Sequence, residues 1–516
     1  MLETLTDRYQ HKIKTPEELR DVLGLRPRSR KVIMCHGVFD VVHPGHVRHL
    51  IYAKSKADIL VASLTADHHI EKGQYRPHVP QDLRAANLAA YEMVDYVVID
   101  KNKEPLENIR LLQPDFFAKG YEYTAQNIHP KTAEEMDVLG DYGGEMIFTP
   151  GDIVYSSTSL INLAPPAIVH EKLLTVMRHG DVSFDALRRT LERMATKTVH
   201  VVGDTIIDSQ TTCAMIGGQT KTPTMSVLYE SRKDFVGGAG IVAKHMRDAG
   251  AKVTFSTVLG DDALKDFALD DLVASGVDVR PHIDKARPTT NKNAIVVGGY
   301  RLLKVDTLDN RSISDDILDA IAAGIETEES DAVVFSDFRH GIFNRRTTSR
   351  LIDAIPAGRF RVADSQVASR WGNITEFKEF DLITPNEREA RFALADQESP
   401  LRALASYLYD AAQCKVLMMK LGDRGVLSCI SAEHNSLDSF FTIDSFADRV
   451  LDAVGAGDGL LAYGTLAMLV SDSPYQATIL GSMAAACVCE RDGNSPVSPE
   501  DVLAKIDAVE KGVRYG

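Results

Sequence analysis

Basic residues are fewer than acidic residues in this chain of 516 residues. It contains 58 Lys and Arg against 73 Asp and Glu, which gives a formal net charge of −15. Binding to DNA or RNA requires clustered Lys and Arg that displace counterions from the phosphates. The composition therefore argues against a nucleic-acid partner, and an anionic ligand must be bound by individual cations and helix N-termini.

Paired cysteines and long apolar runs are also missing. The six cysteines show no paired spacing, which indicates a reducing compartment. Cys487 and Cys489 fall in an Ala-rich helical pattern, where we expect packing rather than metal binding. The longest apolar run, residues 459–470, is shorter than the about 20 residues that a membrane span needs. Because the N-terminus also lacks a charged-then-apolar signal, we expect a cytoplasmic protein with no membrane partner.

Two common nucleotide-binding motifs are absent. No Gly-x-x-x-x-Gly-Lys-Ser/Thr occurs, which excludes a P-loop enzyme, and no Gly-x-Gly-x-x-Gly follows an expected strand, which argues against a dinucleotide site. The chain is also too long for a single core, so we expect two or more domains.

Short apolar strands alternate with helical patterns twice along the chain. A double proline, Pro165-Pro166, separates the two sets, and a helix with Phe184, Leu187 and Leu191 on one face follows it. Such strands predict parallel sheets covered on both faces, hence an α/β fold with two doubly wound domains. The expected division is residues 1–162, a linker with a helix at 163–196, and residues 197–516. Strands are expected at 32–35, 59–63, 96–99, 116–118 and 146–148, then at 199–202, 253–258, 332–336, 361–363, 382–384 and 416–420.

The most informative stretch is the glycine-rich segment 452–458, Asp-Ala-Val-Gly-Ala-Gly-Asp. Gly455 and Gly457 allow a tight turn, and the apolar residues 459–470 predict the helix that follows. The first amides of that helix would face an anion such as a γ-phosphate. Asp458 would then take a proton from a substrate hydroxyl. The alternative is a plain strand-to-helix turn that the Asp caps.

A second motif occupies residues 37–46, Gly-Val-Phe-Asp-Val-Val-His-Pro-Gly-His, between a strand and a helical pattern. His43 and His46 would converge at a helix N-terminus and donate hydrogen bonds to a triphosphate during attack on its α-phosphate, while Gly45 allows close approach. The alternative is a zinc site, but two histidines at this spacing lack a third ligand nearby.

From about residue 197 onward the chain resembles the PfkB, or ribokinase-like, sugar kinases. Besides the glycine-rich segment, residues 201–204, 237–239 and 386–389 carry the resemblance. It implies that Asp458 is the catalytic base and that Asn386 and Glu389 hold Mg²⁺ through water. For Asp204 and Asp337 a turn or cap role is an equal alternative. The resemblance implies sugar-binding positions at Asp208, Gly237, Gly238, Ile241 and Asp337, and nucleotide- or phosphate-binding positions at Lys420, Gly422, Asp423, Asp452, Gly455, Ala456 and Gly457.

The motif 37–46 closely resembles the signature of the cytidylyltransferase-like nucleotidyltransferases. Three further pieces follow in the family's order: Arg76-Pro77 with Arg84, Lys119-Gly120, and residues 156–158. The alternative for Arg76, Arg84 and Lys119 is that they are solvated charges on the surface. The resemblance implies catalytic roles for His43 and His46, and nucleotide or phosphate contacts at Gly37, Phe39, Arg76, Arg84, Lys119, Ser157 and Thr158.

Together the halves resemble the bifunctional heptose 7-phosphate kinases/heptose 1-phosphate adenylyltransferases of ADP-heptose synthesis, with the domain order reversed. The resemblance implies phosphorylation of a sugar or sugar phosphate with ATP and transfer of a nucleotidyl group from ATP, or CTP, to a sugar 1-phosphate. We also expect a homo-oligomer, a dimer. Two family positions differ, since Ile241 replaces an amide side chain and Gln366 replaces a cation. If Ile241 faces the sugar, the favoured substrate should have no hydroxyl that needs a partner there.

Two other hypotheses remain open. The same chemistries could act on a non-heptose sugar or polyol with CTP. Alternatively, one half could be degenerate and serve only for ligand binding or dimerisation, although both reaction centres look complete.

Overall fold

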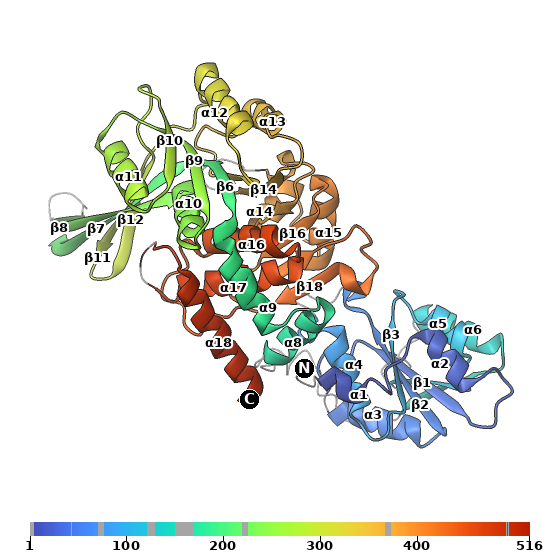
Figure 1. Cartoon of the computed structure of the whole chain (residues 1–516). Coiled ribbons are helices and arrows are strands. Elements are labelled where there is room, and N and C mark those ends of the chain that lie inside the picture. Colours follow the sequence, from blue (N-terminus) through green and yellow to red (C-terminus); the bar gives the residue numbers. More distant parts are fainter. Residues whose placement is uncertain are drawn as a thin grey trace. The chain divides into compact units, whose positions relative to one another are not determined.

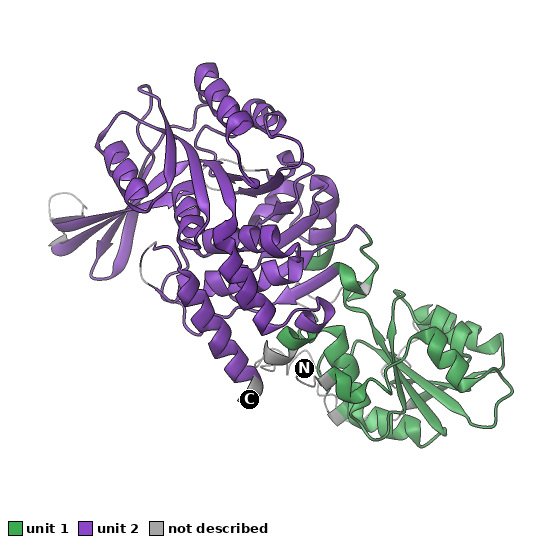
Figure 2. Cartoon of the chain, in the orientation of Figure 1, with its two compact units in different colours: residues 1–175, 399–403, 433–439 green, residues 176–398, 404–432, 440–516 purple. Residues whose placement is uncertain are grey.

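The computed structural model describes residues 5–42, 44–70, 77–120, 130–149, 169–218, 225–366, 373–491, 493 and 495–515 (Figure 1). The chain divides into two compact units (Figure 2). The first contains residues 1–175, 399–403 and 433–439, and the second contains residues 176–398, 404–432 and 440–516. The main division, at residue 175, falls inside the segment 163–196 that the sequence predicts as a linker.

The first unit is built on a five-stranded parallel sheet of order β3-β2-β1-β4-β5. Ile33 and Cys35 enter one apolar cluster and Val32 and Met34 enter another, so both faces of β1 are buried. The strands are β1 (Val32–Gly37), β2 (Ile59–Thr65), β3 (Tyr96–Asp100), β4 (Phe116–Gly120) and β5 (Glu145–Thr149). The helices are α1 (Leu5–Tyr9), α2 (Pro16–Leu23), α3 (Pro44–Lys54), α4 (Gln81–Ala89), α5 (Leu106–Leu112) and α6 (Pro130–Gly140).

The order of the strands reverses at β1, which has β2 on one side and β4 on the other. Ligands of open α/β sheets bind at such a reversal, outside the carboxyl ends of the strands. The motif at residues 37–46, here called the histidine motif, begins at Gly37, where strand β1 ends. Helix α3 begins at Pro44, within the motif. The topology therefore places this motif where the sheet offers a binding site.

The second unit contains a nine-stranded sheet of order β10-β9-β6-β13-β14-β15-β16-β17-β18. Its strands are parallel as far as β16, while β17 and β18 pair antiparallel at one edge. The six predicted strands of this half all form. The strands are β6 (Thr198–Gly203), β9 (Lys252–Leu259), β10 (Asp278–Ile283), β13 (Ala332–Asp337), β14 (Phe360–Ser365), β15 (Leu382–Ile383), β16 (Val416–Lys420), β17 (Val426–Cys429) and β18 (Phe440–Ile443).

A second sheet of this unit, here called the projecting sheet, was not predicted (Figure 1). Its order is β12-β11-β7-β8, with β7 and β11 parallel and the outer pairs antiparallel. Most side chains of β8 and β12 are exposed, so these strands lack the continuous apolar run of a buried strand. The strands are β7 (Thr205–Gly218), β8 (Met225–Gly238), β11 (Asn291–Val297) and β12 (Tyr300–Thr307).

Two apolar helices, α16 (Ala456–Ser471) and α17 (Pro474–Cys489), are buried along most of their length. None of the helices in the described part of the chain combines the length and apolar character that a membrane span requires. The predicted helix before the second strand set is confirmed, because α9 (Phe184–Arg193) buries Phe184, Leu187 and Leu191. The other helices are α8 (Val169–His179), α10 (Ala239–Asp248), α11 (Ala263–Ala274), α12 (Asp315–Thr327), α13 (Arg345–Asp353), α14 (Glu387–Leu394), α15 (Leu401–Ala412) and α18 (Pro499–Tyr515).

Candidate active sites

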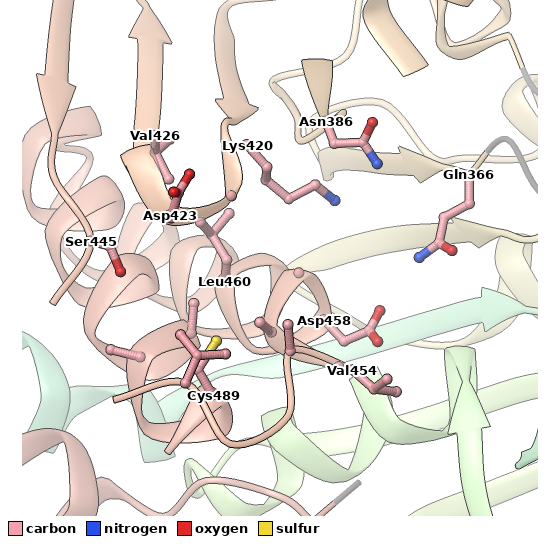
Figure 3. Close-up of a pocket in the computed structure, with 18 of the residues that line it drawn as sticks. Gln366, Asn386, Lys420, Asp423, Val426, Ser445, Val454, Asp458, Leu460 and Cys489 are labelled. Atoms are coloured by element: carbon pink, nitrogen blue, oxygen red, sulfur yellow. The ribbon is translucent and has the colours of Figure 1, made fainter. Parts of the chain in front are cut away.

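A cavity of about 600 Å³ in the second unit is lined by residues of both its sheets. Gln366 follows β14, Asn386 follows β15 and Lys420 ends β16, while Asp458 comes from the glycine-rich segment (Figure 3). Parallel strands present their carboxyl ends at one edge of a sheet, so side chains distant in sequence converge there. The cavity therefore joins the glycine-rich segment to three other parts of the chain.

The glycine-rich segment forms the turn into α16. Gly455 is the N-cap residue and has φ 84°, a left-handed conformation that favours glycine. Gly455, Ala456 and Gly457 all line the cavity. The N-terminus of a 16-residue helix, with its partial positive charge, thus forms part of the cavity wall and is suited to an anion.

Asp458 lies in the first turn of α16 and is only 7% exposed. Its Oδ1 atom is buried and has no hydrogen-bond partner among the described residues. Burial raises the pKa of Asp458 to about 8; the negative charge of Asp364 adds to this rise, and Lys420 opposes it. A cavity carboxyl with a pKa near neutrality and an unpaired oxygen is suited to accept a proton.

Asn386 and Glu389 form a capping box at the start of α14. Asn386 Oδ1 accepts a hydrogen bond from the Glu389 amide at 2.9 Å, and Glu389 Oε2 accepts one from the Asn386 amide at 2.7 Å. The described residues contain no group of three or more His, Cys, Asp or Glu side chains suited to a metal. Oxygen donors already engaged in a cap fit a Mg²⁺ ion held mainly by substrate phosphates and water, rather than by a protein cage.

The projecting sheet contributes three charged residues to the same cavity. Asp208 lies on β7, Lys292 on β11 and Lys304 on β12. Burial lowers the pKa of Lys292 and raises that of Asp208, and each charge partly offsets the effect on the other. Neither lysine was among the predicted site residues, because β11 and β12, the strands that carry them, were not predicted.

The expected sugar-binding positions divide into two groups. Asp208 and Gly238 line the cavity, whereas Gly237, Ile241 and Asp337 do not. A Cβ atom on Gly238, which has φ 60°, would lie 2.4 Å from the Asp204 carbonyl oxygen, so this position requires glycine. Ile241, the position expected to face the sugar, is fully buried on α10.

Two buried aspartates, Asp204 and Asp337, do not line the cavity but contact residues 338–340. Asp204 Oδ2 accepts hydrogen bonds from the amides of Phe338 and His340, both at 3.1 Å. Asp337 pairs with Arg339 at 2.9 Å; burial raises the pKa of this carboxyl to about 7, and Arg339 opposes the rise. These contacts favour the alternative that both residues hold a turn in place.

The expected nucleotide positions mostly line the cavity, including Gly422 and Asp423. Asp452 is not among the lining residues. Its carboxylate accepts a hydrogen bond from the Val454 amide at 3.1 Å and pairs with Arg301 of β12 at 3.5 Å. Asp452 therefore shapes the glycine-rich segment and links it to the projecting sheet.

The described part of the histidine motif surrounds the end of β1. Phe39 has φ 49° and is 5% exposed, and its ring centroid lies 5.4 Å from that of His46. A Cβ atom on Gly37 would lie 3.3 Å from the Phe39 ring, so Gly37 lets this ring pack against the strand. His43, Arg76, Ser157 and Thr158 lie outside the described residues.

The two described cations of this site already have protein partners. Lys119 donates to Thr132 Oγ1 at 3.0 Å and pairs with Glu135. Arg84 is only 1% exposed and donates to the carbonyls of Val38, Thr65 and Val79 and to Asp67. The guanidinium of Arg84, an expected phosphate contact, is thus enclosed by protein acceptors that it holds together.

Comparison with known families finds two matches, one in the N-terminal half of the chain and one in the rest. The model of the pfkB family carbohydrate kinases matches residues 196–501, and the model of the cytidylyltransferase-like proteins matches residues 34–162. The phosphofructokinase-2 of Escherichia coli, solved in complex with potassium, has a TM-score of 0.51 and 16% identity, covering 61% of this chain and 99% of that one. At this identity the likeness is one of fold.

Two curated relatives are named bifunctional protein HldE. The protein of Syntrophotalea carbinolica is 40% identical over 141 residues, which is 27% of this chain and 28% of that protein. The protein of Desulfatibacillum aliphaticivorans is 27% identical over 316 residues, 60% of this chain and 63% of that protein. Each match thus covers less than two thirds of the relative, and the longer one spans 60% of this chain.

Replacing Asp458 by Asn should stabilise the second unit in a pH-dependent way. The folded carboxyl keeps its proton up to a pKa of about 8, while an unfolded Asp loses it near about 3.9. Between these values the folded state binds more protons, so its stability falls as pH rises. Asp458→Asn should therefore raise the Tm little near about pH 4 and increasingly towards about pH 8, by roughly 2 to 4 °C for each kcal/mol.

Thermal unfolding of both proteins across this pH range measures the effect. Asp472→Asn is the matched control, because Asp472 is exposed at the other end of α16 and Asn tolerates its φ of 51°. A Tm difference that does not change with pH would contradict the raised pKa of Asp458.

Replacing Arg84 by Met should destabilise the first unit specifically. The substitution removes a buried ion pair of 2.6 Å to Asp67 and leaves three carbonyl groups without this donor. Breaking a buried pair costs about 3 to 5 kcal/mol. Hydrogen exchange should rise in β1, β2 and α4 while the second unit is unchanged. Arg110→Met, which removes an exposed pair with Glu107 on α5, should leave hydrogen exchange unchanged in both units. An equal response of the two variants would refute the structural role of Arg84.

Proposed function

The chain belongs to the pfkB family of carbohydrate kinases, and we propose that its C-terminal half transfers the γ-phosphoryl group of ATP to a hydroxyl of a phosphorylated sugar. One observation carries this proposal: Asp458 and the glycine-rich turn share a cavity with Asp208, Lys292 and Lys304 of the projecting sheet. A sugar hydroxyl needs only hydrogen-bond partners, whereas a phosphate on the sugar also needs cations. The two lysines beside Asp208 supply them and favour a sugar phosphate over a free sugar.

The geometry supports a direct transfer with no covalent enzyme intermediate. Asp458 takes the proton of the sugar hydroxyl as its oxygen bonds to the γ-phosphorus, and the bond from the γ-phosphorus to the bridging oxygen of ADP breaks. The N-terminus of α16 stabilises the charge that develops on the transferred group. Asn386 and Glu389 would hold Mg²⁺ through water, and when bound the ion neutralises charge between the β- and γ-phosphates.

For the N-terminal half we propose nucleotidyl transfer from ATP to a sugar 1-phosphate. A phosphate oxygen of the sugar attacks the α-phosphorus and pyrophosphate leaves, giving a nucleotide-activated sugar such as ADP-heptose. His46 of α3, together with His43, would donate hydrogen bonds to the triphosphate. The match to the cytidylyltransferase-like family supports testing CTP beside ATP. The bifunctional relatives support placing the two activities in one chain.

Two substitutions should separate the activities. Asp458→Asn should lower sugar phosphorylation by about 10² to 10⁴ while leaving nucleotidyl transfer from a supplied sugar 1-phosphate nearly intact, because it removes only the base. His46→Ala should have the converse effect. The assay uses purified protein, Mg²⁺, and a panel of sugars and sugar phosphates that includes heptose 7-phosphate, with ATP and then CTP.

Asp472→Asn and His49→Ala serve as controls on α16 and on α3. A panel in which free sugars outperform every sugar phosphate would contradict the role of the two lysines. Loss of both activities in either folded variant would contradict two independent sites. A wild-type protein with only one activity would instead favour a degenerate second half.

We further propose that the chain is a cytoplasmic homodimer. None of the six cysteines, which all lie in the described part of the chain, forms a disulfide, and this supports a reducing compartment. Apolar side chains are exposed on the projecting sheet, among them Leu228 at 58%, Tyr229 at 62% and Tyr300 at 70%, and exposed apolar surface of this kind favours self-association. In sedimentation equilibrium, Leu228→Glu should lower the mass from two chains towards one. Val273→Glu, at a comparably exposed position on α11, should not; a monomeric wild type would refute the proposal.

A further inference from the structure

Lys420 brings an ammonium group into the kinase cavity from the end of β16. Its side chain is 14% exposed, and Nζ donates a hydrogen bond to Asp364 Oδ1 at 2.9 Å. Figure 3 shows the side chain pointing into the space bordered by Gln366, Asn386 and Asp458. Lys420 is therefore a buried cation whose charged end belongs to the cavity.

The same side chain runs along the glycine-rich turn. A Cβ atom on Gly457 would lie 3.2 Å from Lys420 Nζ and 3.4 Å from its Cδ. This proximity means that an anion bound by the first turn of α16 comes within reach of the ammonium group. A Cβ atom at position 457 would therefore crowd the Lys420 side chain, which would have to shift slightly.

Three carboxylates hold Lys420 in its charged form. Burial alone would lower the pKa of Lys420, but Asp364, Glu389 and Asp458 together raise it. Without this cation the neighbouring carboxylates, Asp364 above all, would repel an approaching phosphate. Residue 366, where the resemblance to the sugar kinases implies a cation, is here the neutral Gln366, and it lines the same cavity.

We propose that Lys420 binds the transferred γ-phosphoryl group and supplies, from β16, the positive charge that position 366 lacks. This inference rests on the proposed kinase function of the cavity. Lys420 forms no bond to phosphorus: it donates hydrogen bonds to the γ-phosphoryl oxygens, while the proton of the sugar hydroxyl still passes to Asp458 and ADP leaves. Its contact with Asp364 would orient the ammonium group between turnovers.

The test compares nucleotides that differ only in the γ-phosphate. Lys420→Met should weaken binding of a non-hydrolysable ATP analogue by at least about 10-fold while leaving ADP affinity within a factor of about two, and should lower kcat by about 10² to 10³, as for loss of one charge-stabilising donor. Adding Gln366→Lys to this variant should restore analogue binding. It should also recover at least about one tenth of the kcat that Lys420→Met removes. Lys415→Met is the control, because Lys415 precedes the same strand and its side chain is 78% exposed.

A merely structural Lys420 would give a different pattern. Equal weakening of ADP and the analogue, or no recovery with Gln366→Lys in a folded protein, would overturn the proposal. If Lys420→Met does not fold, Lys420→Gln, which keeps a donor to Asp364 but no charge, takes its place with the same criteria. If no sugar is phosphorylated by the wild type, the proposed function fails, whereas selective loss of analogue binding would still support the contact with the γ-phosphate.

Discussion

The second unit depends on one electrostatic constraint, an acidic side chain that is kept in a buried position at the start of a buried helix. Asp458 is 7% exposed and Asp364 lies close enough to raise its pKa. Two features make this arrangement tolerable: the partial positive charge of the α16 N-terminus and the ammonium of Lys420. The same two features attract a phosphate, so what stabilises the empty cavity also prepares it for its substrate.

Both units place their candidate sites by the same topological rule. In the first unit the histidine motif follows β1, where the strand order reverses, and in the second unit Gln366, Asn386 and Lys420 follow three adjacent parallel strands. Each loop can vary while the sheet beneath it remains fixed, because the strands are held by buried apolar packing. Residues such as Asp204 transmit that rigidity, since its carboxylate fixes the backbone after β13.

Sequence patterns predicted the parts of the fold whose cause is local. The central strands have continuous apolar runs because both of their faces are buried, and the glycines at the start of α16 mark the turn directly. The projecting sheet was not predicted because β8 and β12 are largely exposed and so lack the continuous apolar run of a buried strand. Motif resemblance also could not decide which side chains reach a ligand: Arg84 and Ile241 occupy family positions, yet surrounding protein buries both completely.

Two of the three lysines that line the cavity are balanced by carboxylates of the protein. Lys420 pairs with Asp364, and Lys292 is stabilised by Asp208 and Asp306. A lysine paired in this way keeps its charge without a ligand, but it can exchange its carboxylate for a phosphate, which accepts stronger hydrogen bonds than a neutral group does. Because Lys420 and Lys292 come from different sheets, the cavity has positive charge at two separate places. Two phosphoryl groups, one on the nucleotide and one on the sugar, would therefore each have a cation, and the acceptor hydroxyl could approach Asp458 without bringing the two negative charges together.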